Sequence, residues 1–546
     1  MNGRTKPGLD VLKAALLVGV LGDALLRVTP WGLNVFIWLG AAVASSLVLL
    51  ARWRPAVLRG EGRWLIFPLI FFSAAFAWRD STMLQAIDIL ALLLTLALAG
   101  WRTRAGRIRL ASIGDYLNGM SLAVGSALLG GFPLLTRDVR WKEVAPAGWQ
   151  RHVRSVLVGL FIALPLLFLF GALLTHADAV FEQVVARTFN LDVERLAGHL
   201  VLAGFVAWLA GGFLRGMLMG REVTYTSGGR ASLPRLRLRL PLAEEEPPAK
   251  ALAGDEAKAA AAPFSLGIVE TSVLLSSLNA LFLVFVLVQL RYFFGGAGTV
   301  QLSSNLTYAE YARRGFFELV TVAALVLPLL LGAHWLLRKE HPAHERVFRA
   351  LAGAQILLLF VIMASAVERM NLYQSEYGLT ELRVYTTAFM GWLAVVFIWF
   401  AVTVLRGQRE RFVCGALVAG LLVGALLHLL NPDALIVRTN LAHARAGRVF
   451  DAKYAASLSA DAMPELAAAL PSLNRTDQCV VARRIIERWS PPEEADWRTW
   501  NRSRAKTWRI VRENAGMLQG ILCSRNSGGE VIPLDPNYRP VELIKY

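Results

Sequence analysis

Long apolar blocks alternate with short polar stretches along most of the chain. The blocks are rich in Leu, Ala, Val and Phe, and they lack the strict alternation of a porin-type strand. A helix of about 17–25 apolar residues crosses a hydrocarbon core of roughly 30 Å, and it satisfies its own backbone hydrogen bonds, which lipid cannot do. The pattern predicts an all-α fold: a polytopic transmembrane helical bundle of about 11–12 spans.

The apolar blocks give a set of predicted spans and one ambiguous segment. We place the spans at 11–27, 31–51, 62–79, 81–100, 155–175, 196–219, 268–292, 315–337, 348–368, 384–405 and 411–430. The segment 117–135 holds four glycines and a proline and lies between two basic runs. A crossing there would put one basic run outside, so we prefer a re-entrant or interfacial segment and keep a crossing as the alternative.

Basic residues gather in the short loops, and this sets the expected orientation. The net charge is +17, and clusters such as 52–63 and 102–109 lie between apolar blocks. This is the positive-inside pattern, so we expect a cytoplasmic amino terminus. No basic face is interleaved with exposed aromatic residues, so nucleic acid is not an expected partner; the lipid bilayer is.

Composition divides the chain into four predicted parts. Residues 1–219 form an N-terminal membrane half, and 220–265 form a cytoplasmic linker, first basic and then rich in Pro, Ala and Glu. Residues 266–431 form the second membrane half. Residues 432–546, here called the tail, are predicted to form a small extracytoplasmic helical domain.

Helical periodicity in the tail appears at 433–446, 452–470, 476–489 and 493–513. Asn431-Pro432 and Ser490-Pro491 each resemble a helix N-cap followed by proline at the first helical position. Trp497, Trp500, Arg504, Trp508 and Val511 share one predicted face. We interpret this face as a core stripe, with a helix lying on the membrane surface as the alternative.

Ionisable and strongly polar groups within a bilayer need an explanation, because burying them there is costly. The candidates in or near the spans are Asp23, Asp88, Glu270 and Asn279. A hydrogen-bonded contact between helices is one interpretation. A polar lining along a substrate path is the other.

A second group of candidates lies where two predicted loops reach the outer boundary. We expect an outer ionic cluster that would bind a small molecule or a protein partner, or would only hold helix ends together. Its members are Tyr308, Glu310, Tyr311, Arg313, Arg314, Glu318, Glu368, Arg369, Glu376, Glu381 and Arg383.

Several strings in the second half carry a resemblance to a known family. They are LSSLNALFLVFVLVQLRYFFGG (275–296), LTYAEYARRGFFEL (306–319), ASAVERMNLYQSEYGLTELRVYT (364–386) and LNPDALIVRTNLAHA (430–444). The chain resembles an uncharacterised bacterial membrane family, domain of unknown function 4173, with the related 4153. The resemblance implies a bacterial cytoplasmic (inner) membrane protein and supplies no catalytic residues.

Two of the three cysteines, Cys479 and Cys523, lie in the tail, which we expect to be in an oxidising compartment. We predict that they pair, with two free thiols as the alternative. The chain has no CxxC motif and no Cys/His cluster, so we expect no metal site.

Motifs for phosphate loops, dinucleotide binding, zinc proteases and serine hydrolases are absent from the sequence, and no cofactor is expected. We therefore favour a binding, sensing or scaffolding protein at the outer face of the membrane. A secondary transporter or permease is the first alternative. A membrane enzyme acting on lipid-linked substrates is the second, and it would need Glu318 or Glu368 as its acid or base.

Overall fold

The computed structural model describes residues 4–59, 62–105, 113–141, 193–220, 267–294, 316–338, 341–521, 523–525 and 531–533. The predicted span at 155–175 and nearly all of the 220–265 linker lie outside these residues. Every other predicted span falls on a helix.

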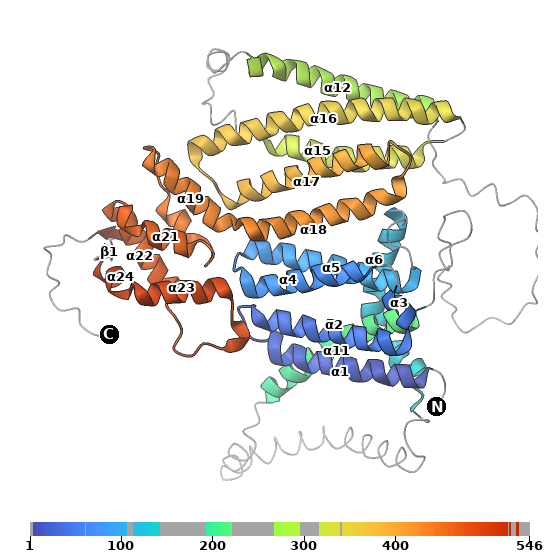
Figure 1. The fold of residues 1–546 in the computed structure, drawn as a ribbon, viewed down its shortest axis with the longest axis horizontal. Coiled ribbons are helices and arrows are strands. Elements are labelled where there is room, and N and C mark those ends of the chain that lie inside the picture. The colour runs from blue at the N-terminus through green and yellow to red at the C-terminus, as the bar shows by residue number, and fades with distance from the viewer. Residues whose placement is uncertain are drawn as a thin grey trace, which may run out of the picture.

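The helices of the first half stack beside those of the second half, and the tail sits at one end of the bundle (Figure 1). The first half comprises α1 (Thr5–Leu26), α2 (Leu33–Trp53), α3 (Pro55–Arg59), α4 (Ile66–Trp78), α5 (Thr82–Ala105), α6 (Ile113–Leu129), α7 (Gly131–Pro133) and α11 (Val193–Met219). The second half comprises α12 (Ile268–Phe294), α15 (Phe316–Leu336), α16 (Pro342–Tyr377), α17 (Glu381–Thr403) and α18 (Phe412–Leu430).

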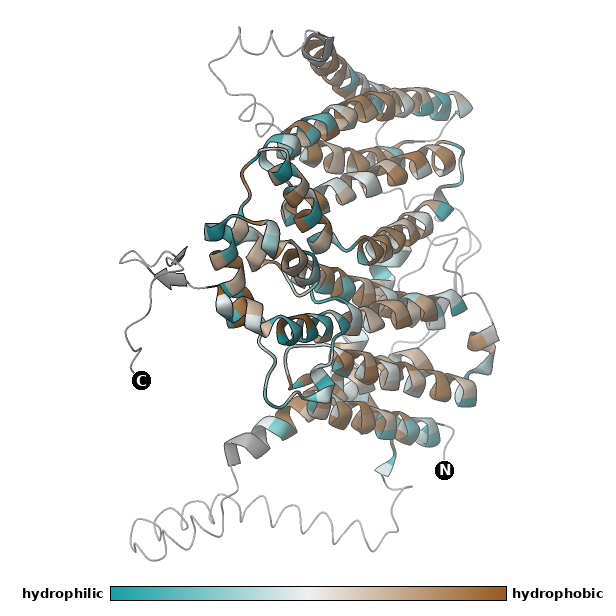
Figure 2. Cartoon of the chain, turned by 60° about the vertical axis from the view of Figure 1, so that its left-hand side comes forward, coloured by the Kyte–Doolittle hydropathy of each residue, from teal (hydrophilic) through white to brown (hydrophobic). Residues whose placement is uncertain are grey.

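The protein is an integral membrane protein with an all-α bundle. In the described part of the chain, 8 helices are long and apolar enough to cross a membrane. Large apolar side chains point outward along them, as at Leu200 (66% exposed), Leu281 (62%) and Leu422 (64%). Figure 2 shows the hydrophobic colour running along the bundle, while the tail mixes hydrophilic and hydrophobic residues. Lipid, and not water, is the solvent that fits such surfaces.

The ambiguous segment 117–135 forms α6 and α7, with a π-helical turn at Leu134–Asp138, and it bends by 52°. Tyr116, near its start, packs with Leu65 and Leu98, at the end of the bundle opposite the tail. Its last residues reach the same end, because Asp138 pairs with Arg215 in the last turns of α11 at 2.5 Å. Both ends therefore lie at one side, as predicted for a re-entrant or interfacial segment.

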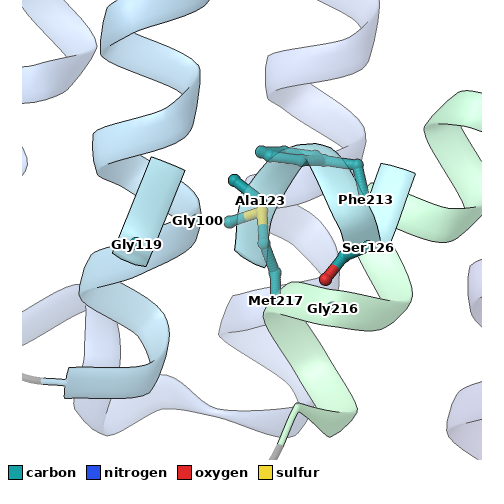
Figure 3. A pocket seen from close by; sticks show the side chains of 7 residues that line it. All are labelled: Gly100, Gly119, Ala123, Ser126, Phe213, Gly216 and Met217. Carbon is teal, nitrogen blue, oxygen red and sulfur yellow. The ribbon is translucent and has the colours of Figure 1, made fainter. Parts of the chain in front are cut away.

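Small residues allow this segment to pack closely. Gly119 lies against the ring of Trp101, where an added Cβ would come within 2.5 Å of ring carbons. A small void of about 10 Å³ lies between α5, α6 and α11 and is lined by Gly100, Ala123 and Phe213 among others (Figure 3). Such a volume holds about one water molecule and is too small for a substrate.

The tail comprises α19 (Pro432–Arg445), α20 (Ala452–Ser457), α21 (Met463–Ala469), α22 (Arg475–Trp489), α23 (Arg502–Glu513), α24 (Ala515–Gly520), and an antiparallel pair, β1 (Cys523–Arg525) and β2 (Val531–Pro533). Short turns of 3-10 helix lie at Arg63–Leu65, Arg409–Arg411, Leu470–Ser472 and Trp497–Thr499. Asn431 is an N-cap, as predicted: its side chain accepts a hydrogen bond from the amide of Ala434 at 3.4 Å.

Two tail predictions were wrong in their boundaries. The helix predicted at 452–470 is broken at 458–462, because a new helix starts with Pro464 in its first turn. The helix predicted at 493–513 begins only at Arg502, and Ser490 ends α22 instead of opening a new helix. Both irregular stretches supply the groups that meet the membrane helices.

The tail core is shared with the bundle. Ile436, Leu466, Val481 and Ile485 are buried together, and Val384 from the start of α17 joins them. The predicted stripe is only partly in this core: Val511 of α23 belongs to it. Trp497 is 61% and Trp500 45% exposed, and both precede the helix.

Candidate functional site

The carboxylate of Asp461 joins the tail to the turn between α4 and α5. Its Oδ2 accepts hydrogen bonds from the backbone amides of Asp80 (2.7 Å) and Ser81 (3.0 Å). Its Oδ1 lies 2.5 Å from the hydroxyl of Ser503 and 3.4 Å from Nη1 of Arg79. The side chain is 0% exposed. A buried carboxylate needs such partners, because an unpaired charge there would be very costly.

Arg79 connects three parts of the chain. Besides Asp461, its guanidinium donates to the carbonyl of His428, at 2.9 Å from Nε and 2.6 Å from Nη2. That carbonyl belongs to the last turn of α18, where backbone acceptors have no partner within the helix. Arg79 thus closes the end of α18 and neutralises the buried carboxylate.

Asp80 and Arg504 form a second buried pair, 3.5 Å apart, with side chains 12% and 4% exposed. Burial raises the pKa of Asp80 from 3.8 to about 6, although the guanidinium of Arg504 opposes the shift. Burial also lowers the pKa of Arg504. Arg504 further donates to the carbonyls of Trp31 (2.7 Å) and Thr499 (2.9 Å). One tail arginine therefore reaches both the α1–α2 turn and the α4–α5 turn.

Asp433 binds the irregular stretch between α20 and α21. Its Oδ2 accepts from the hydroxyl of Ser459 at 2.5 Å and from the amide of Ser459 at 3.3 Å. The residue is 0% exposed. Burial raises the pKa of Asp433 to about 6, and the hydrogen bond from Ser459 opposes that shift.

Asn501 caps two helices with one amide group. Its Oδ1 accepts from the amides of Ser503 and Arg504, which begin α23. Its Nδ2 donates to the carbonyls of Phe76 and Arg79, both at 2.8 Å, at the end of α4. We call the set Arg79, Asp80, Ser81, Asp433, Ser459, Asp461, Asn501, Ser503 and Arg504 the buried junction.

Below the buried junction, Asp88 of α5 contacts His428 of α18 inside the bundle. The Nε2 of His428 lies 2.7 Å from Oδ1 of Asp88, and the two side chains are 0% and 1% exposed. Rings of Phe71, Phe72 and Trp78 surround the imidazole at centroid distances of 5.8–6.4 Å. Asp88, predicted from sequence as an intramembrane polar group, thus has a partner that the sequence did not identify.

A cleft of about 700 Å³ opens beside the buried junction, between the tail and the first two helices. One wall is apolar and comes from the tail-side ends of α1 and α2. The other is the loop before α23. We call it the lateral cleft; it is lined by Leu21, Ala24, Leu25, Ile37, Glu494, Ala495, Asp496, Trp497 and Arg498.

The charged residues that line the lateral cleft are not all in ion pairs. Asp496 holds Arg498 in a two-oxygen contact, with the shortest distance 2.6 Å. The same guanidinium donates to the carbonyl of Ala24 at 2.8 Å, which fastens the loop to α1. Within the described chain, Glu494 forms no ion pair. The lateral cleft therefore has one carboxylate in excess.

The predicted outer ionic cluster can be located only in part. Tyr308, Glu310, Tyr311, Arg313 and Arg314 lie outside the described residues. Glu318 and Glu368 are the residues predicted to act as acid or base if the protein were a membrane enzyme. Both are exposed, and neither forms an ion pair with another described residue. Arg369 is partly buried one position further along α16.

The remaining members of that predicted cluster contact the tail or the α16–α17 turn. Glu376 pairs with Arg448 of the tail at 2.5 Å. The backbone amide of Glu381 donates to the hydroxyl of Tyr454 at 2.8 Å. Arg383 donates to the carbonyl of Gly378 and lies over the ring of Tyr373.

The other predicted intramembrane groups are separate from one another. Asp23 pairs with Arg27 (3.2 Å) and with His199 of α11 (2.5 Å) near the tail end. Glu270 is exposed in the first turn of α12. Asn279 donates to the carbonyl of Leu351 at 2.9 Å, a contact between helices.

Among the described residues, no group of three or more His, Cys, Asp or Glu side chains could hold a metal ion. In the tail, Cys479 is disulfide-bonded, whereas Cys414, in α18, is a thiol. The side chain of Cys523 lies outside the described ones, so its pairing with Cys479 stays a prediction.

The fold and site together define a class: a polytopic helical membrane protein with an extramembrane domain fixed to one end of its bundle. The chain belongs to the family described as a domain of unknown function (DUF4153), which matches residues 66–469. Of the two related families that the sequence resembles, this is the one that matches, and the resemblance to 4173 stays a prediction. No curated protein and no solved structure matches the chain.

The family match covers only part of the candidate site. It includes Asp80, Asp88, His428 and Asp461 and ends before the loop of the lateral cleft. The family's description assigns no activity.

Proposed function

We propose that this protein is a binding protein, a receptor or scaffold, at the outer face of the bacterial cytoplasmic membrane. The amino terminus and the tail lie at opposite ends of the bundle (Figure 1). The basic loop around Arg54 lies at the amino-terminal end, where the positive-inside rule favours the cytoplasm. A disulfide at Cys479 fits an oxidising compartment for the tail.

The observation that carries this proposal is the lateral cleft. The bundle and the tail each contribute one wall of the cleft, and the buried junction fixes the position of one part relative to the other. Its volume, about 700 Å³, is within the range of small-molecule sites, roughly 300–1,000 Å³. An apolar wall with a few polar groups opposite is the arrangement that binds a ligand and fixes its orientation.

Site-specific photo-cross-linking in intact cells tests the proposal. A photoreactive residue in place of Trp497, in the lateral cleft, should give a discrete adduct. The same residue in place of Arg509, exposed on α23 away from the cleft, should not. Equal labelling at both positions, or none at either, would count against a binding role for the cleft.

The orientation has its own test. Alkaline phosphatase fused after residue 470 should be active, and fused at residue 245 inactive. The reverse pattern would place the tail in the cytoplasm and remove the proposed outer-face role.

A secondary transporter is a second candidate, favoured by the Asp88–His428 contact. A carboxyl and an imidazole buried together between two spanning helices can share and pass a proton. In proteoliposomes, a proton-coupled permease would show proton flux that Asp88→Asn abolishes. Flux equal to that of empty vesicles would reject this candidate.

A further inference from the structure

We infer that the lateral cleft holds a phospholipid of the outer leaflet with an ammonium headgroup. This inference rests on the proposed function and adds the chemical class of the ligand. Two observations lead to it: the position of the cleft at the membrane boundary and the sign of its unpaired charge.

The apolar wall lies at the depth of lipid acyl chains near the headgroups. Leu21 and Leu25 belong to the last turns of α1, and Ile37 belongs to the start of α2. Exposed tryptophans lie at the same level: Trp31 is 37% exposed and Trp497 61%. Tryptophan favours the interface between hydrocarbon and water, so these rings mark the boundary. A hydrocarbon chain is the occupant that fits such a wall.

The opposite wall favours a cation. The charge of Arg498 is taken up by Asp496 and by the carbonyl of Ala24. Among the described residues that line the cleft, no other guanidinium is present. Glu494 lines the same space without an ion pair among the described residues. An anionic headgroup would meet a carboxylate that nothing neutralises, whereas an ammonium group would neutralise it.

The ring of Trp497 supplies a second feature suited to an ammonium group. It lines the cleft beside Glu494, and an indole face attracts a nearby cation. Phosphatidylethanolamine combines a cationic amine with acyl chains and therefore matches both walls.

Native mass spectrometry of the full-length chain provides the test. The protein is reconstituted in mixed vesicles of phosphatidylethanolamine and phosphatidylglycerol and then released into detergent. We expect selective retention of phosphatidylethanolamine. Glu494→Gln should lower that retention by about fivefold, as expected for one exposed ion pair. Glu493→Gln is the matched control, because Glu493 is also an exposed carboxylate but does not line the cleft.

The possible outcomes distinguish a failure of the lipid assignment from a failure of the proposed binding role. Equal retention of phosphatidylglycerol, or equal effects of the two substitutions, overturns the ammonium lipid. Glycerophosphoethanolamine is the headgroup without acyl chains. If it displaces bound lipid as well as intact phosphatidylethanolamine does, the ligand is a soluble molecule and not a membrane lipid. Cross-linking at Trp497 still reports a bound partner in either case, so the binding role can survive when the lipid assignment fails.

Discussion

Oδ2 of Asp461 lies 2.7 Å from the backbone nitrogen of Asp80, although 381 residues separate the two positions. The same oxygen accepts the amide of Ser81, so one tail side chain satisfies two consecutive donors in a membrane-helix turn. This contact fixes the tail against the bundle.

Replacing Asp461 with Ala should loosen the tail. The change leaves the amides of Asp80 and Ser81 without their acceptor and removes the carboxylate that neutralises Arg79, a loss of about 3–5 kcal/mol. Protease sensitivity of the tail in detergent should rise sharply, while the spans stay protected. Glu513→Ala, at an exposed position on α23, serves as control. If both variants resist protease equally, Asp461 does not fasten the tail.

Asn501 and Asn474 form a matched pair of helix caps. Asn474 caps α22 alone, whereas Asn501 caps α23 and also holds the end of α4. Asn474→Ala should cost about 1 kcal/mol, and Asn501→Ala at least about 2 kcal/mol, because the carbonyls of Phe76 and Arg79 lose their donor. Thermal unfolding of the two variants measures the difference. Identical losses would show that the contact with α4 contributes nothing.

Stability should fall as the pH rises from about 4 to about 6. Asp80 and Asp433 each have a pKa raised from 3.8 to about 6 by burial, so the folded state binds their protons more tightly than the unfolded chain does. Protonation therefore stabilises the fold at the acidic side of this window, and the gain is lost above it. Asp433→Asn mimics the protonated acid and should remove about half of the slope in melting temperature. An unchanged slope would contradict this role for Asp433.

Thiol labelling tests the predicted Cys479–Cys523 bridge. Denatured, unreduced protein should react at Cys414 alone, and reductant should expose the two tail cysteines. Closing a loop of about 45 residues stabilises a domain by roughly 3–4 kcal/mol in the chain-entropy model. Labelling of both tail cysteines without reductant would exclude the bridge and weaken the case for an outside tail.

The sequence predicted the positions of the described membrane helices well, because most apolar blocks are long enough to specify a span by themselves. The block predicted at 62–79 is an exception, since it forms a shorter apolar helix, Arg63–Trp78. Asp88 was also recognisable, since an acid within a span always needs a partner. The buried junction was not recognisable in the same way. Its groups come from turns far apart along the chain, and hydrophobic periodicity carries no information on which turns meet.

Local signals for parts of the junction were nevertheless present. Pro464 marks the first turn of a new helix, so the break that positions Ser459 and Asp461 was readable from proline placement. Asn501, three residues before Arg504, has the composition of an N-cap. The predicted outer ionic cluster stays a prediction, because one of its two loops lies outside the described residues.

The junction also has a consequence for biogenesis. The tail is synthesised after every spanning helix, yet its anchors, the turns at 27–32 and 79–81, are among the first parts made. Those turns must wait at the membrane surface with their amides and carbonyls in water until residue 504 has emerged. Docking of the tail is therefore a late step of assembly, and a chain that stops short of it leaves the tail end of the bundle uncovered.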